Sequence, residues 1–286
     1  HDRPEAGKCS ATPKVSTMKV NALRRISTLV TLALAAVSQL HSQQPATPNY
    51  YQVLNYIKVP PAGRTEFEHL IKEVSVKVAE ARLNAGEIVS WTLLQTVMPA
   101  GSEARADYLV STLYDGVPPA PRDHSSYEAL FKQAGVTMTL DDFYAKRRQV
   151  SSLVNTELWR PASRVGNLQK GHYLYINFMR VKDAEAYAKF EQTVWQPMAA
   201  EMVKEGNMSG WIFAAKVLPG GTDTAYSHYT ADFFPTWADV FKEWSVETVF
   251  AKAHPGENID DTMAKVATLR SLAVRELWVV AERVAK

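Results

Sequence analysis

The stretch GNMSGWIFAAKVLPGGTD, residues 206–223, repeats an earlier stretch of the chain, GEIVSWTLLQTVMPAGSE, residues 86–103. The two copies place Trp91 opposite Trp211 and Pro99 opposite Pro219. In each copy a glycine precedes an apolar and aromatic run that ends in a turn-forming cluster, which is the pattern of a strand entering a hairpin. An internal repeat of this kind decides the fold, because both copies must form the same structural unit.

Further matches occur in the same order on both sides of this stretch. YQVLNYIKVP (51–60) matches YLYINFMRVK (173–182), and near the end of each half SSLVNTELW (151–159) matches RSLAVRELW (270–278). The offset between matching residues stays between 119 and 123 throughout. The sequence therefore predicts a tandem duplication, with repeats over residues 49–160 and 172–286 and a linker over 161–171.

Each half shows the same order of secondary-structure patterns. A strand-like run is followed by a helical segment, two strand-like runs, a broken helical stretch and a last strand, which is the ferredoxin-like order βαββαβ. Thr139 and Asn258 are expected to cap the resumed helix in each half. Because the strands are apolar on both faces, each sheet needs a cover on both. We expect an α+β fold of two ferredoxin-like βαββαβ repeats, packed sheet to sheet within one chain as a pseudo-two-fold α+β barrel.

The first 42 residues resemble an export leader preceded by extra sequence. Residues 18–42 contain the positive charges Lys19, Arg24 and Arg25, then an apolar run over residues 26–37 and small residues after it. This is the pattern of a signal peptide, and the apolar run is too short to span a bilayer comfortably. Residues 1–17 are expected to be an upstream or disordered segment. The protein is thus expected to be exported, to the periplasm or the cell exterior, without stable membrane insertion after leader removal.

The composition of the remaining chain excludes several classes of function. Residues 1–42 hold six of the 32 Lys and Arg and two of the 30 Asp and Glu, so the remainder carries 26 basic and 28 acidic residues. With no basic stripe, nucleic-acid binding is not expected. The single cysteine, Cys9, lies in the upstream segment 1–17, so the chain after residue 42 has no disulfide, cysteine nucleophile or thiolate metal site.

The element order and patterns such as INFMRVKDAEAYAKFE (176–191) resemble the dimeric α+β barrel superfamily. This superfamily includes antibiotic-biosynthesis-type monooxygenases, haem-degrading monooxygenases and NIPSNAP-like proteins. The resemblance covers both halves, and it implies a monooxygenase-like enzyme that acts on an apolar or aromatic small molecule. Fold alone does not fix function, however, so a non-catalytic ligand-binding protein and a scaffold with a filled cavity remain as alternatives.

One part of the resemblance implies haem. In WSVETVFAKAH (244–254), Trp244 and His254 are spaced as in haem-degrading members of the superfamily, and Asn177 has a matching place in the first strand. If this holds, His254 ligates the haem iron, Trp244 presses on the macrocycle and Asn177 hydrogen-bonds an iron-bound oxygen species. The first half has Ser125 and Gly135 at the positions of Trp244 and His254. The alternative is that His254 is a structural residue at the end of a helix.

Strand alternation suggests a second candidate site. Asn55 and Asn177 lie in the first strands of the two halves, and Glu157 and Glu276 lie in the last strands. If all four face the space between the sheets, a carboxylate there has a raised pKa and can act as a general base. Alternatively, the asparagines satisfy backbone groups, and the glutamates pair with arginines such as Arg160, Arg164 and Arg275.

Overall fold

Strands rich in β-branched and aromatic residues form a closed antiparallel barrel in the computed structural model, which describes residues 49–221 and 223–286. The barrel order is β1-β3-β2-β8-β5-β7-β6-β4, and β4 pairs again with β1. The strands are β1 (Tyr50–Lys58), β2 (Ser90–Met98), β3 (Tyr108–Asp115), β4 (Ser152–Gly166), β5 (Tyr173–Val181), β6 (Gly210–Leu218), β7 (His228–Phe234) and β8 (Arg270–Ala285). The predicted segments 1–17 and 18–42 lie outside the described residues.

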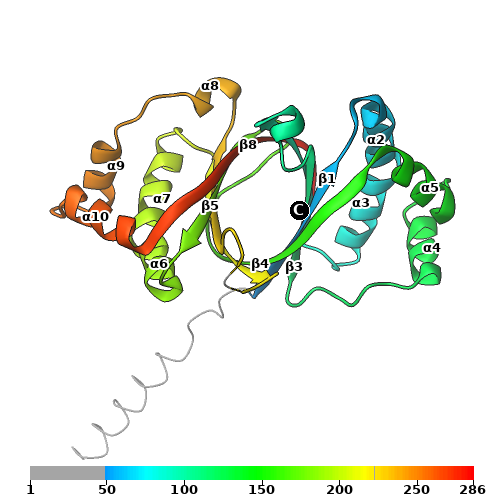
Figure 1. Ribbon diagram of the computed structural model, residues 1–286, viewed down its shortest axis with the longest axis horizontal. Helices are drawn as coiled ribbons and strands as arrows, with labels where there is room; N and C mark the ends of the chain where they lie inside the picture. The colour runs from blue at the N-terminus through cyan, green and yellow to red at the C-terminus, as the bar shows by residue number, and fades with distance from the viewer. Residues whose placement is uncertain (1–48, 222) are drawn as a thin grey trace, which may run out of the picture. The chain divides into compact units, whose positions relative to one another are not determined.

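Helices cover the outside of the barrel in two groups (Figure 1). In the first half they are α2 (Arg64–Leu70), a π-helical segment η2 (Ile71–Val76), α3 (Lys77–Asn84), α4 (His124–Gln133) and α5 (Leu140–Val150). In the second half they are α6 (Ala184–Phe190), a π-helical segment η4 (Glu191–Trp195), α7 (Gln196–Lys204), α8 (Trp237–Val240), α9 (Val246–Ala253) and α10 (Ile259–Leu269). No helix among the described residues is long and apolar enough to cross a membrane.

The helix ends follow the local sequence. The side chain of Thr139 accepts a hydrogen bond from the Asp142 amide, and that of Asn258 accepts from the Asp260 and Asp261 amides. Both predicted caps are therefore confirmed. They start α5 and α10, the helices that lead directly into the long strands β4 and β8.

The two long strands join the halves. β4 pairs with β1 over Ser152–Trp159 and with β6 over Leu158–Gly166, while β8 pairs with β5 and then with β2. The halves are therefore linked edge to edge into one closed sheet whose inner face is shared. The predicted linker over 161–171 is wrong in its first part, because residues 161–166 continue β4. Pairing with β6 satisfies backbone groups that a free linker would leave to water.

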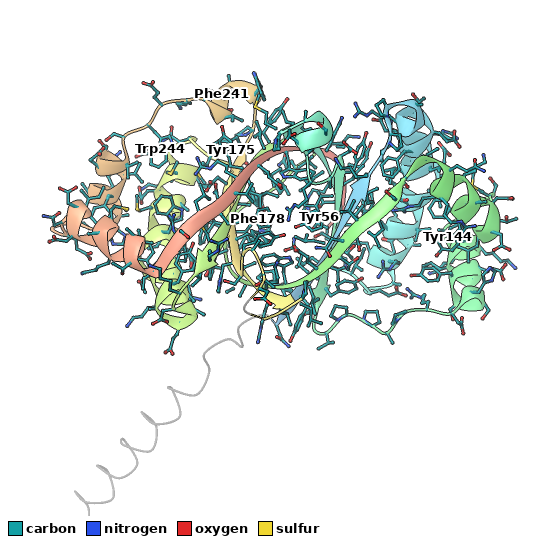
Figure 2. All side chains as sticks on the ribbon, in the orientation of Figure 1. Tyr56, Tyr144, Tyr175, Phe178, Phe241 and Trp244 are labelled. Carbon is teal, nitrogen blue, oxygen red and sulfur yellow. The ribbon has the colours of Figure 1, made fainter. Side chains whose placement is uncertain are left out.

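The barrel interior holds one apolar and aromatic cluster, which includes Tyr56, Trp159, Phe178, Tyr229 and Trp278. Figure 2 shows Tyr56 and Phe178 inside the barrel, whereas Tyr144 and Trp244 lie in the outer helical layers on opposite sides. Separate clusters lie between the sheet and the helices of each half. The inner face and the two outer faces are therefore distinct environments for a site.

Candidate functional site

A buried polar cluster centred on Glu157 lies inside the barrel. The carboxylate of Glu157 is 1% exposed and accepts hydrogen bonds from the Tyr56 hydroxyl (2.9 Å), the Tyr226 hydroxyl (2.7 Å) and the Trp159 indole (3.1 Å). Lys216 Nζ lies 3.1 Å from the same carboxylate and forms a buried ion pair with it. Burial raises the pKa of Tyr56, so this phenol stays protonated and donates.

Glu276 occupies the corresponding place on β8. It accepts hydrogen bonds from the Trp278 indole (3.2 Å) and from Arg105 Nη2 (3.1 Å). The Arg105 guanidinium carbon lies 4.1 Å from the centre of the Tyr56 ring and 4.6 Å from that of Phe178, so the cation is held between two aromatic faces. Both glutamates are therefore paired with cations and hydrogen-bonded, which makes them structural groups rather than poised bases.

The four residues predicted to share one site do not come together. Leu54 pairs with Glu157 and Asn55 with Thr156, while Ile176 pairs with Glu276 and Asn177 with Arg275. The glutamates therefore face the barrel interior and the asparagines face the helices. The predicted shared face is wrong because residues directly opposite each other in paired strands lie on the same face, and the partners of the glutamates are Leu54 and Ile176 rather than the asparagines.

Asn177 is held in a network behind the second-half sheet. Its amide nitrogen donates to Asp232 at 2.9 Å and its amide oxygen accepts from Arg275 Nε. With both ends of the side chain engaged and 3% of the residue exposed, Asn177 has no donor aimed at a bound molecule. Close by, Glu191 is 3% exposed, and burial raises its pKa to about 7.

The residues implied to bind haem do not fit a haem site. Trp244 precedes α9, and His254 is the C-cap of that helix, so they flank the helix rather than sharing it. The Nε2 atom of His254 donates to the Val194 carbonyl at 2.9 Å, so this nitrogen is not free to ligate iron. The space between the sheet and α6–α9 is filled by a side-chain cluster that includes Tyr187, Trp211 and Phe250. We therefore derive no step through haem.

Asn55 lines a pocket between the sheet and the helices of the first half. This sheet–helix pocket lies between the β1-β3-β2 part of the barrel and the helices of the first half, and has a volume of about 520 Å³. Its aromatic lining residues are Trp91, Tyr114, Tyr127, Phe131, Phe143 and Tyr144. The Thr156 hydroxyl donates to Asn55 Oδ1 at 2.8 Å, which leaves the amide NH₂ of Asn55 to donate toward the pocket.

Arginines supply the charge of the sheet–helix pocket. Arg82 is engaged, since it donates to Glu87 Oε2 (3.3 Å) and to the Tyr114 hydroxyl (3.1 Å). Arg147 forms no ion pair with any carboxylate of the described residues, and burial lowers its pKa from the usual value. Its guanidinium carbon lies 5.9 Å from the centre of the Phe143 ring. No carboxylate or histidine of the described residues lines this pocket, so its electrostatics favour an anion.

Sequence reasoning missed Arg105, Tyr226 and Arg147 as candidates. Arg105 and Tyr226 lie in the connections between paired strands, and only the closed barrel brings them to the glutamates. Arg147 belongs to the helix that precedes β4, in the segment KRR at 146–148, which reads as a solvated basic face. The described residues contain no cluster of three or more histidine, cysteine, aspartate or glutamate side chains placed to bind a metal.

Comparison with solved structures finds similar overall architectures at low identity. A protein of Lactobacillus acidophilus NCFM described as a "putative monooxygenase" matches with a TM-score of 0.49 and 11% identity, over 83% of this chain and 96% of the other. An anthrone oxidase-like protein matches with a TM-score of 0.48 and 10% identity, over 84% and 94%. A haem-binding protein of Thermus thermophilus matches with a TM-score of 0.43 and 10% identity, over 81% and 91%.

No protein-family model matches the chain, and no curated protein is similar to it. At these levels of similarity the solved structures assign no function to this chain.

Proposed function

We propose that the protein binds a small aromatic molecule carrying an ionised oxygen, such as a phenolate, enolate or aromatic acid, in the sheet–helix pocket. The observation that carries this proposal is Arg147, a cation without a carboxylate partner among the described residues, in a pocket of about 520 Å³. This volume lies within the range of pockets that hold small ligands. The aromatic lining matches a planar ligand, and Arg147 matches its negative charge.

Asn55 strengthens the match. Its amide NH₂ is available to donate, because the Thr156 hydroxyl occupies only the amide oxygen. One amide donor and one guanidinium can together hold the oxygen of an enolate or phenolate. They also lower its pKa, since both interact better with the charged form.

The test is displacement of 1-anilinonaphthalene-8-sulfonate, an aromatic anion, by 1-naphthoate and by neutral 1-methylnaphthalene. Arg147→Gln is expected to weaken naphthoate binding about tenfold or more, as loss of a charge-assisted hydrogen bond does. The same change should leave methylnaphthalene binding nearly unaltered. Lys146→Gln is the matched control, because Lys146 is an exposed neighbour that pairs with Glu66 at 3.7 Å. If Arg147→Gln and Lys146→Gln weaken naphthoate binding equally, the proposal is wrong.

A second candidate is turnover of such a ligand by a monooxygenase-like reaction. The pocket's anion-stabilising pair, Asn55 and Arg147, favours it, because an enolate reacts directly with dioxygen. In balanced form, an activated CH₂ group and O₂ give a C=O group and water. An oxygen electrode with anthrone as substrate tests it: consumption that falls in Asn55→Ala and Arg147→Gln supports turnover. Binding without oxygen consumption leaves the non-catalytic function.

We also propose that the chain is exported and that its halves are tandem ferredoxin-like repeats. The leader pattern of residues 18–42 supports export, and the ordered sequence matches at offsets of 119 to 123 support duplication. Mass spectrometry of protein recovered from the native host tests export. A mature amino terminus between residues 38 and 49 is expected, and retention of residues 18–42 would contradict it.

A further inference from the structure

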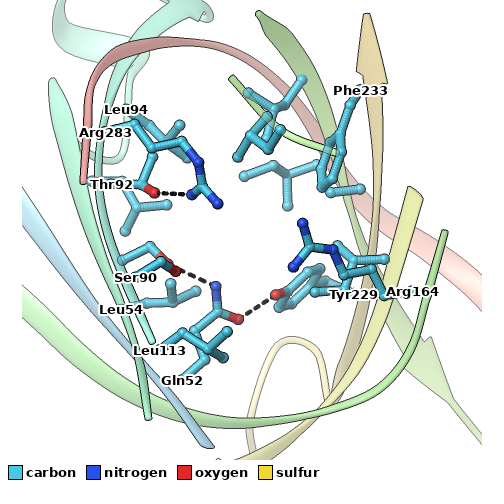
Figure 3. Close-up of a pocket in the computed structure, with 17 residues that line it drawn as sticks. Gln52, Leu54, Ser90, Thr92, Leu94, Leu113, Arg164, Tyr229, Phe233 and Arg283 are labelled. Carbon is cyan, nitrogen blue, oxygen red and sulfur yellow. Dashed lines mark hydrogen bonds between the residues drawn. The ribbon is translucent and has the colours of Figure 1, made fainter. Parts of the chain in front are cut away.

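A second cavity opens at one end of the barrel interior, away from the Glu157 cluster. It has a volume of about 80 Å³, enough for several water molecules or a small organic group. Figure 3 shows Arg164 of β4 and Arg283 of β8 reaching into it from opposite walls. This barrel-mouth cavity lies on the inner face of the sheet, so it is separate from the sheet–helix pocket.

Each arginine is turned inward by an extra residue in its strand. On β4, Pro161 pairs with Ala214 and Ser163 with Phe213, so Ala162 is unmatched. On β8, Val280 pairs with Leu94 and Glu282 with Leu93, so Ala281 is unmatched. Each bulge lies two residues before the arginine, and without it strand alternation would point that side chain out of the barrel. Such bulges commonly re-aim side chains at functional sites.

The two arginines face each other without acidic partners. No carboxylate lines the cavity, and neither arginine forms an ion pair within the part of the chain that the structure describes. Arg283 Nη1 donates to the Thr92 hydroxyl at 2.6 Å, which positions the guanidinium. Burial, together with the charge of Arg164, lowers the pKa of Arg283 to about 10, so the Arg283 guanidinium remains charged at neutral pH. Asp115, an acidic side chain at the mouth, lines only the outer depression with them.

The deeper wall of the cavity is apolar. Gln52 is a fixed polar element on one side, since its amide nitrogen donates to Ser111 (2.7 Å) and its amide oxygen accepts from the Tyr229 hydroxyl. The apolar lining residues are Leu54, Leu94, Leu109, Leu113, Leu168, Leu174, Ile176, Ile212, Ala231 and Phe233. The cavity thus combines two convergent cations at its entrance with hydrocarbon below them.

We propose that the barrel-mouth cavity binds a small organic acid, with its carboxylate between Arg164 and Arg283 and its apolar body against the leucines and isoleucines. Two guanidinium groups can each donate to one carboxylate, which is a strong and directional arrangement. The anion also removes the repulsion between the two cations. An inorganic anion lacks the apolar body, and a neutral alcohol lacks the charge, so both should bind more weakly.

Isothermal titration with hexanoate, hexanol, acetate and inorganic phosphate tests this assignment. Hexanoate is expected to bind one to one, and to bind at least about tenfold more tightly than hexanol or acetate. Arg164→Gln and Arg283→Gln should each raise the Kd for hexanoate about tenfold or more, in line with loss of a charge-assisted hydrogen bond. If phosphate binds as tightly as hexanoate, or if hexanoate does not bind at all, the proposal is wrong.

Two matched variants separate this site from other sources of anion binding. Arg160→Gln removes an exposed arginine of the same strand that donates to Asn49 at 3.0 Å, and it should leave hexanoate binding unchanged. Arg147→Gln removes the cation proposed to bind the ligand in the sheet–helix pocket and should also leave hexanoate binding unchanged. If either variant weakens hexanoate as much as Arg164→Gln does, the assignment is wrong. The proposals for the two sites can therefore be refuted independently of each other.

Thermal unfolding distinguishes a ligand-binding role of Arg283 from a purely structural one. Because the two cations repel each other in the ligand-free protein, Arg283→Met should raise the Tm or leave it unchanged, while abolishing the Tm increase that hexanoate causes in the original protein. A lowered Tm with a retained hexanoate effect would show that Arg283 only supports the fold.

Discussion

The Tyr56 hydroxyl donates a 2.9 Å hydrogen bond to the carboxylate of Glu157 on the neighbouring strand β4, and both residues are at most 1% exposed. Lys216 of β6 reaches the same carboxylate from the other side of β4. A single side chain thus connects strands of both halves. Since each donor is buried, removal of the charge would leave several polar groups without a partner.

Glu157→Gln is therefore expected to destabilise the protein by about 3 kcal/mol, the usual cost of leaving one member of a buried ion pair unpaired. Urea unfolding measures the difference. The matched control is Glu73→Gln, which removes an exposed pair with Lys77 and should change the unfolding free energy far less than Glu157→Gln does. The double variant Glu157→Gln/Lys216→Met should be more stable than Glu157→Gln alone. If the losses of the two single variants simply add in the double variant, the two side chains are not energetically paired.

Glu191 should make the stability fall as the pH rises. Burial raises its pKa in the folded protein to about 7, from 4.5 for the free side chain. A raised carboxyl pKa means that the folded state favours the protonated form, so this stabilisation is complete below pH 4.5 and is lost as the pH rises through 7. The shift corresponds to a loss on the order of 3 kcal/mol.

Glu191→Gln, which cannot ionise, should therefore match the original protein near pH 4.5 and exceed it in unfolding free energy at about pH 8. Guanidinium unfolding at several pH values measures this difference. Glu185→Gln, an exposed change in the preceding helix α6, should not alter the pH profile. If the unfolding free energies of Glu191→Gln and the original protein differ by the same amount at every pH, the pKa of Glu191 is not shifted.

His254 is expected to act as a helix-end residue. His254→Ala removes the hydrogen bond to the Val194 carbonyl and should lower the unfolding free energy by about 1–2 kcal/mol. Haemin titration followed by absorbance should show no Soret shift that depends on His254. A shifted Soret band in the original protein that disappears in His254→Ala would contradict this assignment, and His124→Ala, at an exposed histidine, is the control for nonspecific haemin binding.

The sequence was most informative where both halves repeated one pattern. Thr139 and Asn258 were predicted as helix caps from their position before paired aspartates, and the structure confirms both. Strands that are apolar on both faces predict an α+β barrel with two sheets packed face to face, whereas the structure joins the halves edge to edge into one closed sheet. In contrast, the linker prediction failed because pairing of residues 161–166 with β6 depends on contacts with the other half, which no local propensity reports.

The candidate site was harder to predict, because single extra residues in the long strands decide which side chains face inward. The strand register places Leu54 and Ile176 rather than the asparagines opposite the glutamates. Ala162 and Ala281, in turn, turn Arg164 and Arg283 into the barrel. Strict alternation, applied along β4 and β8, cannot detect such bulges. A repeated alanine two residues before each arginine is the only trace of them in the sequence.

A crystal structure of the protein soaked with 1-naphthoate shows whether the sheet–helix pocket holds an aromatic anion against Arg147. We expect density for the ring among Trp91, Phe131 and Tyr144, with the carboxylate within hydrogen-bonding distance of the Arg147 guanidinium. If the pocket stays empty while naphthoate saturates the protein in solution, or if the carboxylate points away from Arg147, this pocket is not the binding site proposed for it.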